Sequence, residues 1–146
     1  MNITLVMSCD YRGFTDGAPH NREEVNAYVR GKTVLQGRRT FQQHGLVPNA
    51  ANLILSRTLP LRDDALVLRS RAELRAIAKA ERVWVLGGNS VFKQLYMLAD
   101  SAILEKWLID CPGRDGAQFA FETWNVRDAH HHGAYSFYDL RRRCSL

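Results

Sequence analysis

The sequence lacks the features that mark membrane, secreted and multidomain proteins. Its 146 residues contain no apolar run close to the roughly 18–20 residues that cross a bilayer. The first ten residues, MNITLVMSCD, have no basic start and no cleavage site, so a secretory signal is not expected. Internal repeats, low-complexity tracts and linker-like stretches are absent too. We therefore expect a cytoplasmic protein that folds as a single domain over residues 1–146.

Cysteine is scarce. Cys9, Cys111 and Cys144 are widely spaced and odd in number, which excludes a disulfide framework and a CxxC metal motif. Reduced thiols suit a cytosolic compartment, and Cys9 is expected to be a small core residue rather than a nucleophile. Three adjacent histidines occupy residues 130–132, but neighbouring histidines in a polar segment rarely converge on one ion. We predict no metal site.

Charge is moderately positive and without a dense basic patch. The formal net charge is +5, from 20 Lys and Arg against 15 Asp and Glu, which would admit nucleic-acid binding. The basic residues are scattered, however, and only residues 141–143 form a run of three arginines. A protein whose ligand carries several phosphates or carboxylates has the same balance. The expected partner is therefore a small anionic molecule, not nucleic acid or a membrane.

Apolar strands alternate with helices along the chain. Strands are predicted at residues 3–9, 32–36, 52–56, 66–69, 83–86 and 102–109, and helices at residues 22–30, 38–44, 71–80 and 91–98. From residue 119 the tail alternates more and predicts antiparallel closing strands. This order indicates an α/β domain with a mainly parallel central sheet and an antiparallel C-terminal strand. Continuous apolar strands also need helices on both faces of the sheet.

Two segments combine the end of a strand, glycine and the start of a helix. Free N–H groups at a helix N-terminus hold phosphate well. Residues 33–41 (TVLQGRRTF) add a hydroxyl and two arginines, and residues 83–92 (VWVLGGNSVF) add paired glycines that permit a close approach of the backbone. Each turn alone is often only a tight connection, but two on neighbouring strands can hold two parts of a pyrophosphate. Neither is a GxGxxG or Walker A motif, and no nucleophile elbow is present.

The order and spacing of three segments resemble the dihydrofolate reductase family. The family's V-x-x-G-R-x-T-[FW] segment is similar to residues 34–41, a strand ending in L-S-R is similar to residues 52–57, and V-x-G-G-x-x-[VI]-[YF] is similar to residues 85–92. The end of the chain, residues 135–143, resembles the family's last strand. The resemblance covers nearly the whole chain and implies the dihydrofolate-reductase fold with NADPH as the cofactor.

The resemblance also implies which residues hold NADPH. The first turn would bind phosphate oxygens. The adenosine 2′-phosphate would be met by Ser56, Arg57 and Arg69. The second turn, with a cis Gly87–Gly88 peptide, would accept the pyrophosphate and the nicotinamide side. A guanidinium suits phosphate because it donates a planar fork. The alternative for the first turn is that its two arginines form only a solvated helix face. The implied cofactor residues are Gly37, Arg38, Arg39, Thr40, Ser56, Arg57, Arg69, Gly87, Gly88, Asn89, Ser90, Val91 and Phe92.

Two candidates for the catalytic acid, Glu23 and Glu24, lie on the first predicted helix. The family carries an acid on this helix that pairs with two N–H groups of a 2-amino-4-oxo ring. Glu24 is preferred because it lies four residues before Tyr28, as the family's acid precedes an aromatic residue. Val25 and Tyr28 are expected to face inward. The alternative is that both glutamates only favour the positive end of the helix.

Glu105 is a second candidate for the acid. It lies inside the apolar strand at residues 102–109, at or near the family's threonine that supports the acid. A buried charge is costly unless paired, and burial would raise its pKa, as a proton donor near neutral pH requires. The alternatives are an ion pair with Lys106 or an exposed strand face. The implied substrate residues are Leu5, Val6, Glu24, Tyr28 and Glu105.

The substrate half departs from the family pattern at three further places. His20 follows Pro19 where the family has tryptophan, Phe92 replaces a tyrosine, and residues 49–51 (NAA) lack the arginine that clamps the folate glutamate. Loss of this arginine removes a charge-assisted pair, so methotrexate-type antifolates are expected to bind weakly.

These observations predict an NADPH-dependent dihydrofolate reductase. It would transfer a hydride to a pterin C=N bond, most simply from 7,8-dihydrofolate to tetrahydrofolate, in one-carbon metabolism. One alternative is a reductase of a ribosylamino-pyrimidine, similar to the riboflavin-pathway reductase domain. Another is a non-catalytic NADPH-binding module. A monomer is expected, and a dimer is compatible with the sequence.

Overall fold

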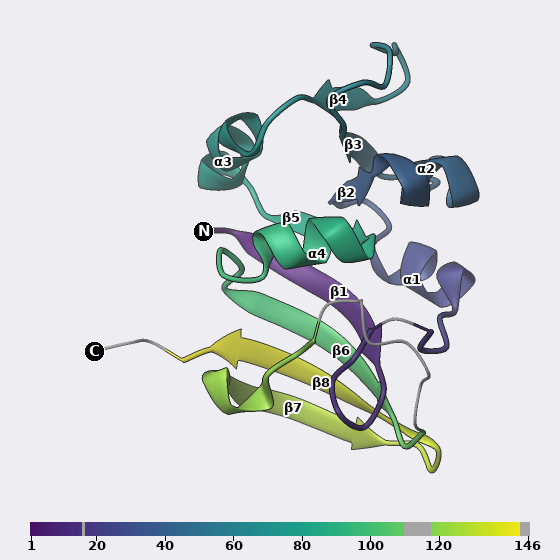
Figure 1. Ribbon diagram of the computed structural model, residues 1–146, viewed down its shortest axis with the longest axis vertical. Coiled ribbons are helices and arrows are strands. Elements are labelled where there is room, and N and C mark those ends of the chain that lie inside the picture. The colour runs from purple at the N-terminus through teal and green to yellow at the C-terminus, as the bar shows by residue number, and fades with distance from the viewer. Residues whose placement is uncertain (16, 110–117, 144–146) are drawn as a thin grey trace.

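The computed structural model describes residues 1–15, 17–109 and 118–143 (Figure 1). Cys111 and Cys144 lie outside the described residues. The strands are β1 (Ile3–Cys9), β2 (Thr33–Gly37), β3 (Ala51–Leu55), β4 (Leu66–Leu68), β5 (Val83–Gly87), β6 (Ser101–Trp107), β7 (Trp124–His131) and β8 (Tyr135–Arg142). The helices are α1 (Arg22–Tyr28), α2 (Arg38–His44), α3 (Arg71–Ala80) and α4 (Asn89–Leu95), with a short 3-10 turn η1 (Phe121–Thr123).

All eight strands join one sheet, in the order β4-β3-β2-β5-β1-β6-β8-β7. Neighbours from β4 to β6 pair in parallel, and β8 pairs antiparallel with both β6 and β7. The prediction of a mainly parallel sheet with an antiparallel C-terminal end is therefore confirmed. Two predicted helices need correction: α1 stops at Tyr28, because the chain turns at Gly31 (φ +77°), and α4 begins at Asn89, capped by Gly88.

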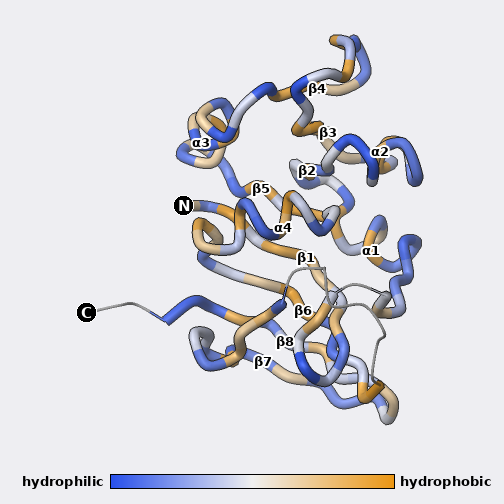
Figure 2. The backbone as a smooth tube through the Cα atoms, viewed as in Figure 1, coloured by the Kyte–Doolittle hydropathy of each residue, from blue (hydrophilic) through white to orange (hydrophobic). Residues whose placement is uncertain are grey.

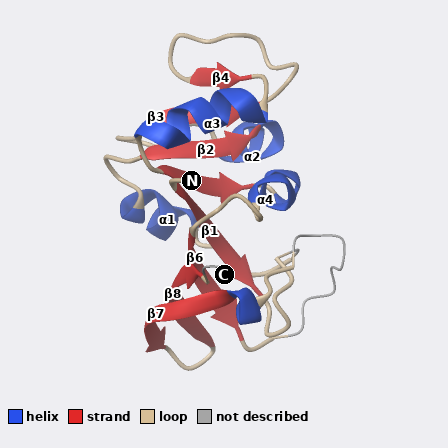
Figure 3. Ribbon diagram, turned by 90° about the vertical axis from the view of Figure 1, so that its left-hand side faces the viewer, coloured by secondary structure: helices blue, strands red, loops and turns tan. Residues whose placement is uncertain are grey.

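Two hydrophobic clusters cover the two faces of the sheet. The larger cluster joins alternate residues of β1 and β5 to α3 and α4, and includes Cys9, which is fully buried. The smaller cluster lies on the other face, where Val25 of α1 packs near Val6 and Val34. α2 lies on the same face of the sheet as α1. The connections β1–α1–β2 and β2–α2–β3 both move toward β4, and connections between parallel strands are right-handed. Figure 2 shows hydrophobic residues concentrated in the central strands, and Figure 3 shows the same strands and the helices around them from the side.

The carboxyl ends of the parallel strands meet at one edge of the sheet. After β1 the chain moves to one face through α1, whereas after the neighbouring β5 it moves to the other face through α4. Ligands of open α/β sheets bind in the crevice at such a point, where the direction of the connections reverses. The two glycine turns predicted to bind phosphate, at Gly37 and Gly87-Gly88, lie at this edge.

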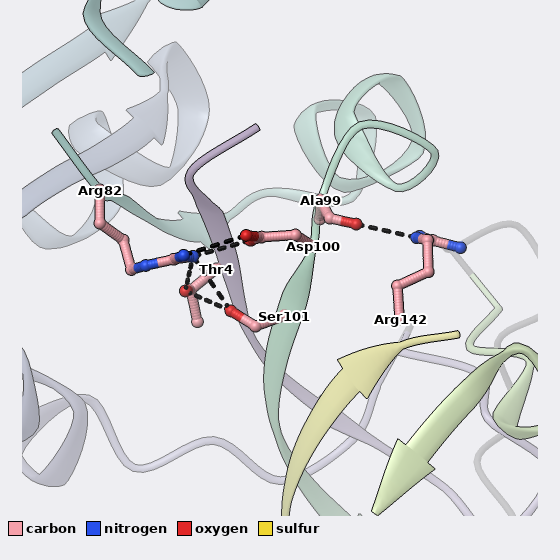
Figure 4. Close-up of polar contacts among 6 residues, drawn as sticks. All are labelled: Thr4, Arg82, Ala99, Asp100, Ser101 and Arg142. Carbon is pink, nitrogen blue, oxygen red and sulfur yellow. Dashed lines mark hydrogen bonds and ion pairs between the residues drawn. The ribbon is translucent and has the colours of Figure 1, made fainter. Parts of the chain in front are cut away.

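At the opposite edge, a polar cluster joins the starts of three adjacent strands. Arg82, just before β5, donates to both carboxylate oxygens of Asp100 at 2.7 and 3.0 Å, and to the hydroxyls of Thr4 and Ser101 at 2.9 and 3.2 Å (Figure 4). The Thr4 and Ser101 hydroxyls are themselves 2.6 Å apart. Nearby, Arg142 of β8 donates to the carbonyl of Ala99 at 2.8 Å. These bonds fix the register of β5, β1 and β6 at the edge remote from the crevice.

Arg82→Gln should lower the free energy of unfolding by about 1–3 kcal/mol, because it leaves a partly buried carboxylate without its charged partner. Burial acts to raise the pKa of Asp100, but the hydrogen bonds and charge of Arg82 outweigh that effect and lower it. The stabilisation is thus present above the ordinary carboxyl pKa and is lost as the pH falls through the lowered folded value. Chemical denaturation at neutral and acidic pH measures both effects, with Arg127→Gln, an exposed position on β7, as the control. Equal stability of the two variants would contradict this role.

Candidate active site

A cleft in three connected parts runs along the carboxyl edge of the sheet. A basic cavity of about 1160 Å³ lies between α2, α3 and α4. It shares Thr40, Gly88 and Asn89 with a middle cavity of about 150 Å³ at the ends of β1 and β5. The middle cavity in turn shares residues 6–8 and His20 with an inner cavity of about 230 Å³ between α1, β6 and β8. One elongated ligand, or two ligands meeting in the middle, can therefore occupy the cleft.

Six arginines line the basic cavity, on the strand ends, the loop after β3 and the first turns of α2 and α3. Four of them were predicted from the sequence, whereas the two on α3 were missed. The two missed arginines are four residues apart and lie on one face of α3, directly after the Ser70 cap. This spacing was the sequence signal that could have identified them. The six arginines are Arg38, Arg39, Arg57, Arg69, Arg71 and Arg75.

Arg69 and Ser56 shape the wall of this cavity. The Arg69 guanidinium donates to the carbonyls of Leu59 at 2.6 Å and Ser56 at 3.2 Å, so part of its hydrogen-bonding capacity holds the loop after β3. The Ser56 hydroxyl accepts hydrogen bonds from the backbone N–H groups of Leu59 at 3.0 Å and Thr58 at 3.3 Å. The loop is thereby held against the cavity, and the exposed Arg57 side chain follows directly after Ser56.

The two glycine turns touch one another where the basic and middle cavities meet. A Cβ on Gly37 would lie 2.7 Å from a methyl carbon of Val91, and a Cβ on Gly88 would lie 2.9 Å from the Thr40 hydroxyl. Gly87 has φ +134°, a conformation that side-chain-bearing residues rarely adopt, and its bond to Gly88 is cis, as the resemblance implied. The close approach leaves backbone N–H groups of the α2 and α4 starts facing one cavity, which suits phosphate.

The middle cavity contains charged groups that the sequence did not indicate. Arg22 and His44 line it together with His20, and Phe92 closes it beside the Gly87-Gly88 turn. The His20 and His44 ring centroids are 6.1 Å apart. Arg22 lies in α1 and His44 in α2. Polar residues in short helices usually face solvent, so no local sequence pattern indicated that these two line a cavity.

The inner cavity brings Glu24 and Glu105 to one site. Glu24 lines it from α1 and Glu105 from β6, across from Tyr135 and Phe137 of β8. Glu105 is half-buried, and its pKa is raised by burial and by the negative charge of Glu24, while the nearby Trp107 indole opposes the shift. The alternative of an ion pair between Glu105 and Lys106 is not favoured, because the Lys106 ammonium lies over the ring of Phe121, 4.4 Å from its centroid.

Two predicted residues lie elsewhere than expected. Leu5 is fully buried in the larger core cluster and lines none of the three cavities, whereas Val6 lines two of them. Glu23 is exposed outside the cleft, because it follows Arg22 on the outer side of the short helix. Tyr28 lines the inner cavity, as expected from its inward direction, and is 42% exposed and edge-on to Trp84.

The three adjacent histidines have separate surroundings. His130 bonds to Asp128 at 3.0 Å, His131 bonds to the Ser136 hydroxyl at 2.7 Å, and the His132 ring stacks on Tyr135. Within residues 1–15, 17–109 and 118–143, no group of three or more His, Cys, Asp and Glu side chains could hold a metal ion. In the same ranges, no helix has the length and apolar character needed to cross a membrane.

The class defined by these features is an α/β protein with an arginine-lined cleft where the connections of its sheet reverse direction. The family model described as dihydrofolate reductase matches residues 18–135, and the chain belongs to this family. Membership supports folate reduction in general, and hence an oxidoreductase. No curated protein matches the chain.

Among solved structures, the chain is similar to a dihydrofolate reductase from Enterococcus faecalis complexed with NADP(H) and RAB-propyl. The TM-score is 0.77, the sequence identity is 18%, and the match covers 97% of this chain and 96% of that chain. At this identity the likeness concerns the fold, which confirms the dihydrofolate-reductase-like architecture expected from the sequence.

Glu24→Gln should lower the pKa of Glu105 toward its ordinary value, because it removes the negative charge that disfavours ionisation of Glu105. A carboxyl-carbon NMR titration of the two proteins measures this change. Glu23→Gln, at the exposed neighbouring position, is the matched control and should leave the Glu105 titration where it is. A Glu105 titration that is the same in all three proteins would show that the two carboxylates do not interact.

Proposed function

We propose that this protein reduces a C=N bond of a dihydropterin with NADPH, most simply 7,8-dihydrofolate to tetrahydrofolate. The observation that carries the proposal is the connected cleft: arginines and glycine turns at one end, and two glutamates at the other, with one glutamate held at a raised pKa. A phosphate-bearing cofactor and a ring with N–H donors fit its opposite ends and meet in the middle cavity.

The basic cavity fits the phosphates of NADPH. The starts of α2 and α4 would hold the pyrophosphate, and Arg57 with the arginines of α3 would hold the adenosine 2′-phosphate. Gly37 and Gly88 support this assignment, because a Cβ at either position would strike Val91 or Thr40 and would force the two turns apart. When bound, NADPH supplies the hydride; the chain positions both reactants and limits the access of water to them.

Glu105 is proposed as the acid that orients the substrate ring, with Glu24 facing it across the inner cavity. A carboxylate accepts two parallel hydrogen bonds from the amino and ring N–H groups of a 2-amino-4-oxo ring. The ionised form of Glu105 would make these two contacts, whereas its raised pKa increases the protonated fraction closer to neutral pH, and only that fraction could act as a general acid. Glu24 contributes the charge that raises this pKa, and the half-buried Tyr135 and Phe137 supply apolar surface for the ring.

A reductase of a ribosylamino-pyrimidine is the second candidate. Two observations favour it: residues 49–51 (NAA) carry no arginine for a folate glutamate, and the inner cavity of about 230 Å³ is small. Both reactions use the same cofactor end of the cleft. Assays at 340 nm with NADPH and each substrate separately distinguish them.

Arg57→Gln should weaken NADPH binding by about tenfold and leave NADH binding unchanged, because it removes a charge-assisted contact to the 2′-phosphate alone. Quenching of intrinsic tryptophan fluorescence measures both affinities. Arg30→Gln, an exposed arginine after α1, is the control for a general change of charge. Equal losses for NADPH and NADH would exclude the 2′-phosphate assignment, and no binding of NADPH by the unaltered protein would exclude the proposed function.

Glu105→Gln should lower kcat by about a hundredfold or more while NADPH binding is retained, because a general acid typically contributes a factor of that size. The variant should fold, since the site already disfavours the charged form of Glu105. Glu24→Gln should shift the pH profile of kcat to lower pH, and Glu23→Gln should act like the unaltered protein. Wild-type rates in both the Glu24 and Glu105 variants would refute the assignment of the acid.

A further inference from the structure

The middle cavity holds a cation that the proposed reaction does not use, the Arg22 guanidinium, with two histidines beside it. Arg22, His20 and His44 line it from α1, the segment before α1, and α2. None of the three belongs to the glycine turns or to the basic cavity. His20 also lines the inner cavity, so this cationic cluster borders the place proposed for the substrate ring.

The Arg22 guanidinium is anchored but incompletely paired. One terminal nitrogen donates to the Gln36 side-chain oxygen, and Gln36 is itself 1% exposed and donates to the Gly45 carbonyl at 3.0 Å. The other two guanidinium nitrogens are shielded from solvent and have no acceptor in the described part of the chain. A buried donor without an acceptor is costly, and burial lowers the pKa of Arg22. The guanidinium is therefore positioned for an acceptor that the described residues do not supply.

The histidines of the cluster are also unfavourably placed for carrying charge. The pKa of His20 is lowered by burial, by Arg22 and by His44, and the pKa of His44 is lowered by burial and by Arg22. No carboxylate is among the groups that shift either histidine within the described residues. A bound anion would relieve this repulsion and would favour the protonated histidines.

We propose that Arg22, together with His20 and His44, binds an anionic group of the substrate, a carboxylate or a phosphate. The inference rests on the proposed function and narrows its substrate to a dihydropterin or pyrimidine that carries a negatively charged side chain. Arginine with two free N–H groups suits such a group, because it can donate two hydrogen bonds to its oxygens. The cluster would take over the role of the arginine that residues 49–51 lack.

The experiment uses ligand pairs that differ in the anionic group, with binding measured by calorimetry on the full chain in the presence of NADPH. Folate is compared with its glutamate diamide, which keeps the pterin and the aminobenzoyl ring and lacks only the carboxylates, to test a carboxylate source. A ribosylamino-pyrimidine 5′-phosphate is compared with its nucleoside to test a phosphate source. The variants are Arg22→Gln and Arg22→Lys, with Arg30→Gln as the matched control on the far side of α1.

In at least one pair, the anionic member should bind the unaltered protein about tenfold more tightly than its neutral partner. Arg22→Gln should remove that preference while changing the neutral member less than about twofold, Arg22→Lys should restore part of it, and Arg30→Gln should keep it. Absence of a preference in both pairs, or an equal loss with Arg22→Gln and Arg30→Gln, overturns the inference. Should Arg22→Gln not fold, His44→Gln, at an exposed position, serves as the second variant and should reduce the preference.

The design separates this inference from the proposed function. Turnover with NADPH is measured on the same proteins. Turnover that is independent of Arg22 and of the anionic group would refute the proposed anion site and support the reductase. An Arg22-dependent preference for the anionic ligand, without turnover of either substrate, would refute the proposed reductase and support the anion site.

Discussion

Parallel pairing of β1, β2 and β5 is the constraint on which the cleft depends. Because parallel strands end at the same edge, the turns at Gly37 and Gly87-Gly88, which lie about fifty residues apart in the sequence, become neighbours. The register shift between Leu35 and Gln36 sets Gln36 opposite Gly87, so the two turns meet closely enough that a Cβ on Gly37 would strike Val91. Two helix starts then face one cavity, and neither turn alone would form it.

Stability and binding are separated between the two edges of the sheet. At the amino edge, Arg82 pairs with Asp100 and with the hydroxyls of Thr4 and Ser101, so its charge is neutralised. At the carboxyl edge, six arginines gather around one open cavity and repel one another. A ligand with several phosphates relieves that repulsion and should stabilise the fold by mass action. Folding is therefore favoured by one cluster of charges and opposed by the other.

The sign of charge also changes along the cleft. The basic cavity and the Arg22 cluster are positive, whereas the inner cavity contains Glu24 and Glu105. Burial and like charges shift the pKa values of the two parts in opposite directions: that of Glu105 is raised by burial and by Glu24, and that of His20 is lowered by burial, Arg22 and His44. Each cavity thus suits a ligand group of opposite polarity: the inner cavity suits a ring with N–H donors, and the basic and middle cavities suit an anion.

The strands and the two phosphate-type turns followed from the sequence, because hydrophobic period, capping residues and glycine act within a few neighbouring residues. The candidate acids followed from the resemblance to the dihydrofolate reductase family. The positions of Glu24 and Glu105 relative to one another did not follow, since α1 and β6 meet only through the pairing of β1 with β6. The same holds for the contact of Arg22 with Gln36, because α1 and β2 are separate elements. Local chemistry thus determined the elements and their turns, and the long-range pairing of strands decided which side chains face a common cavity.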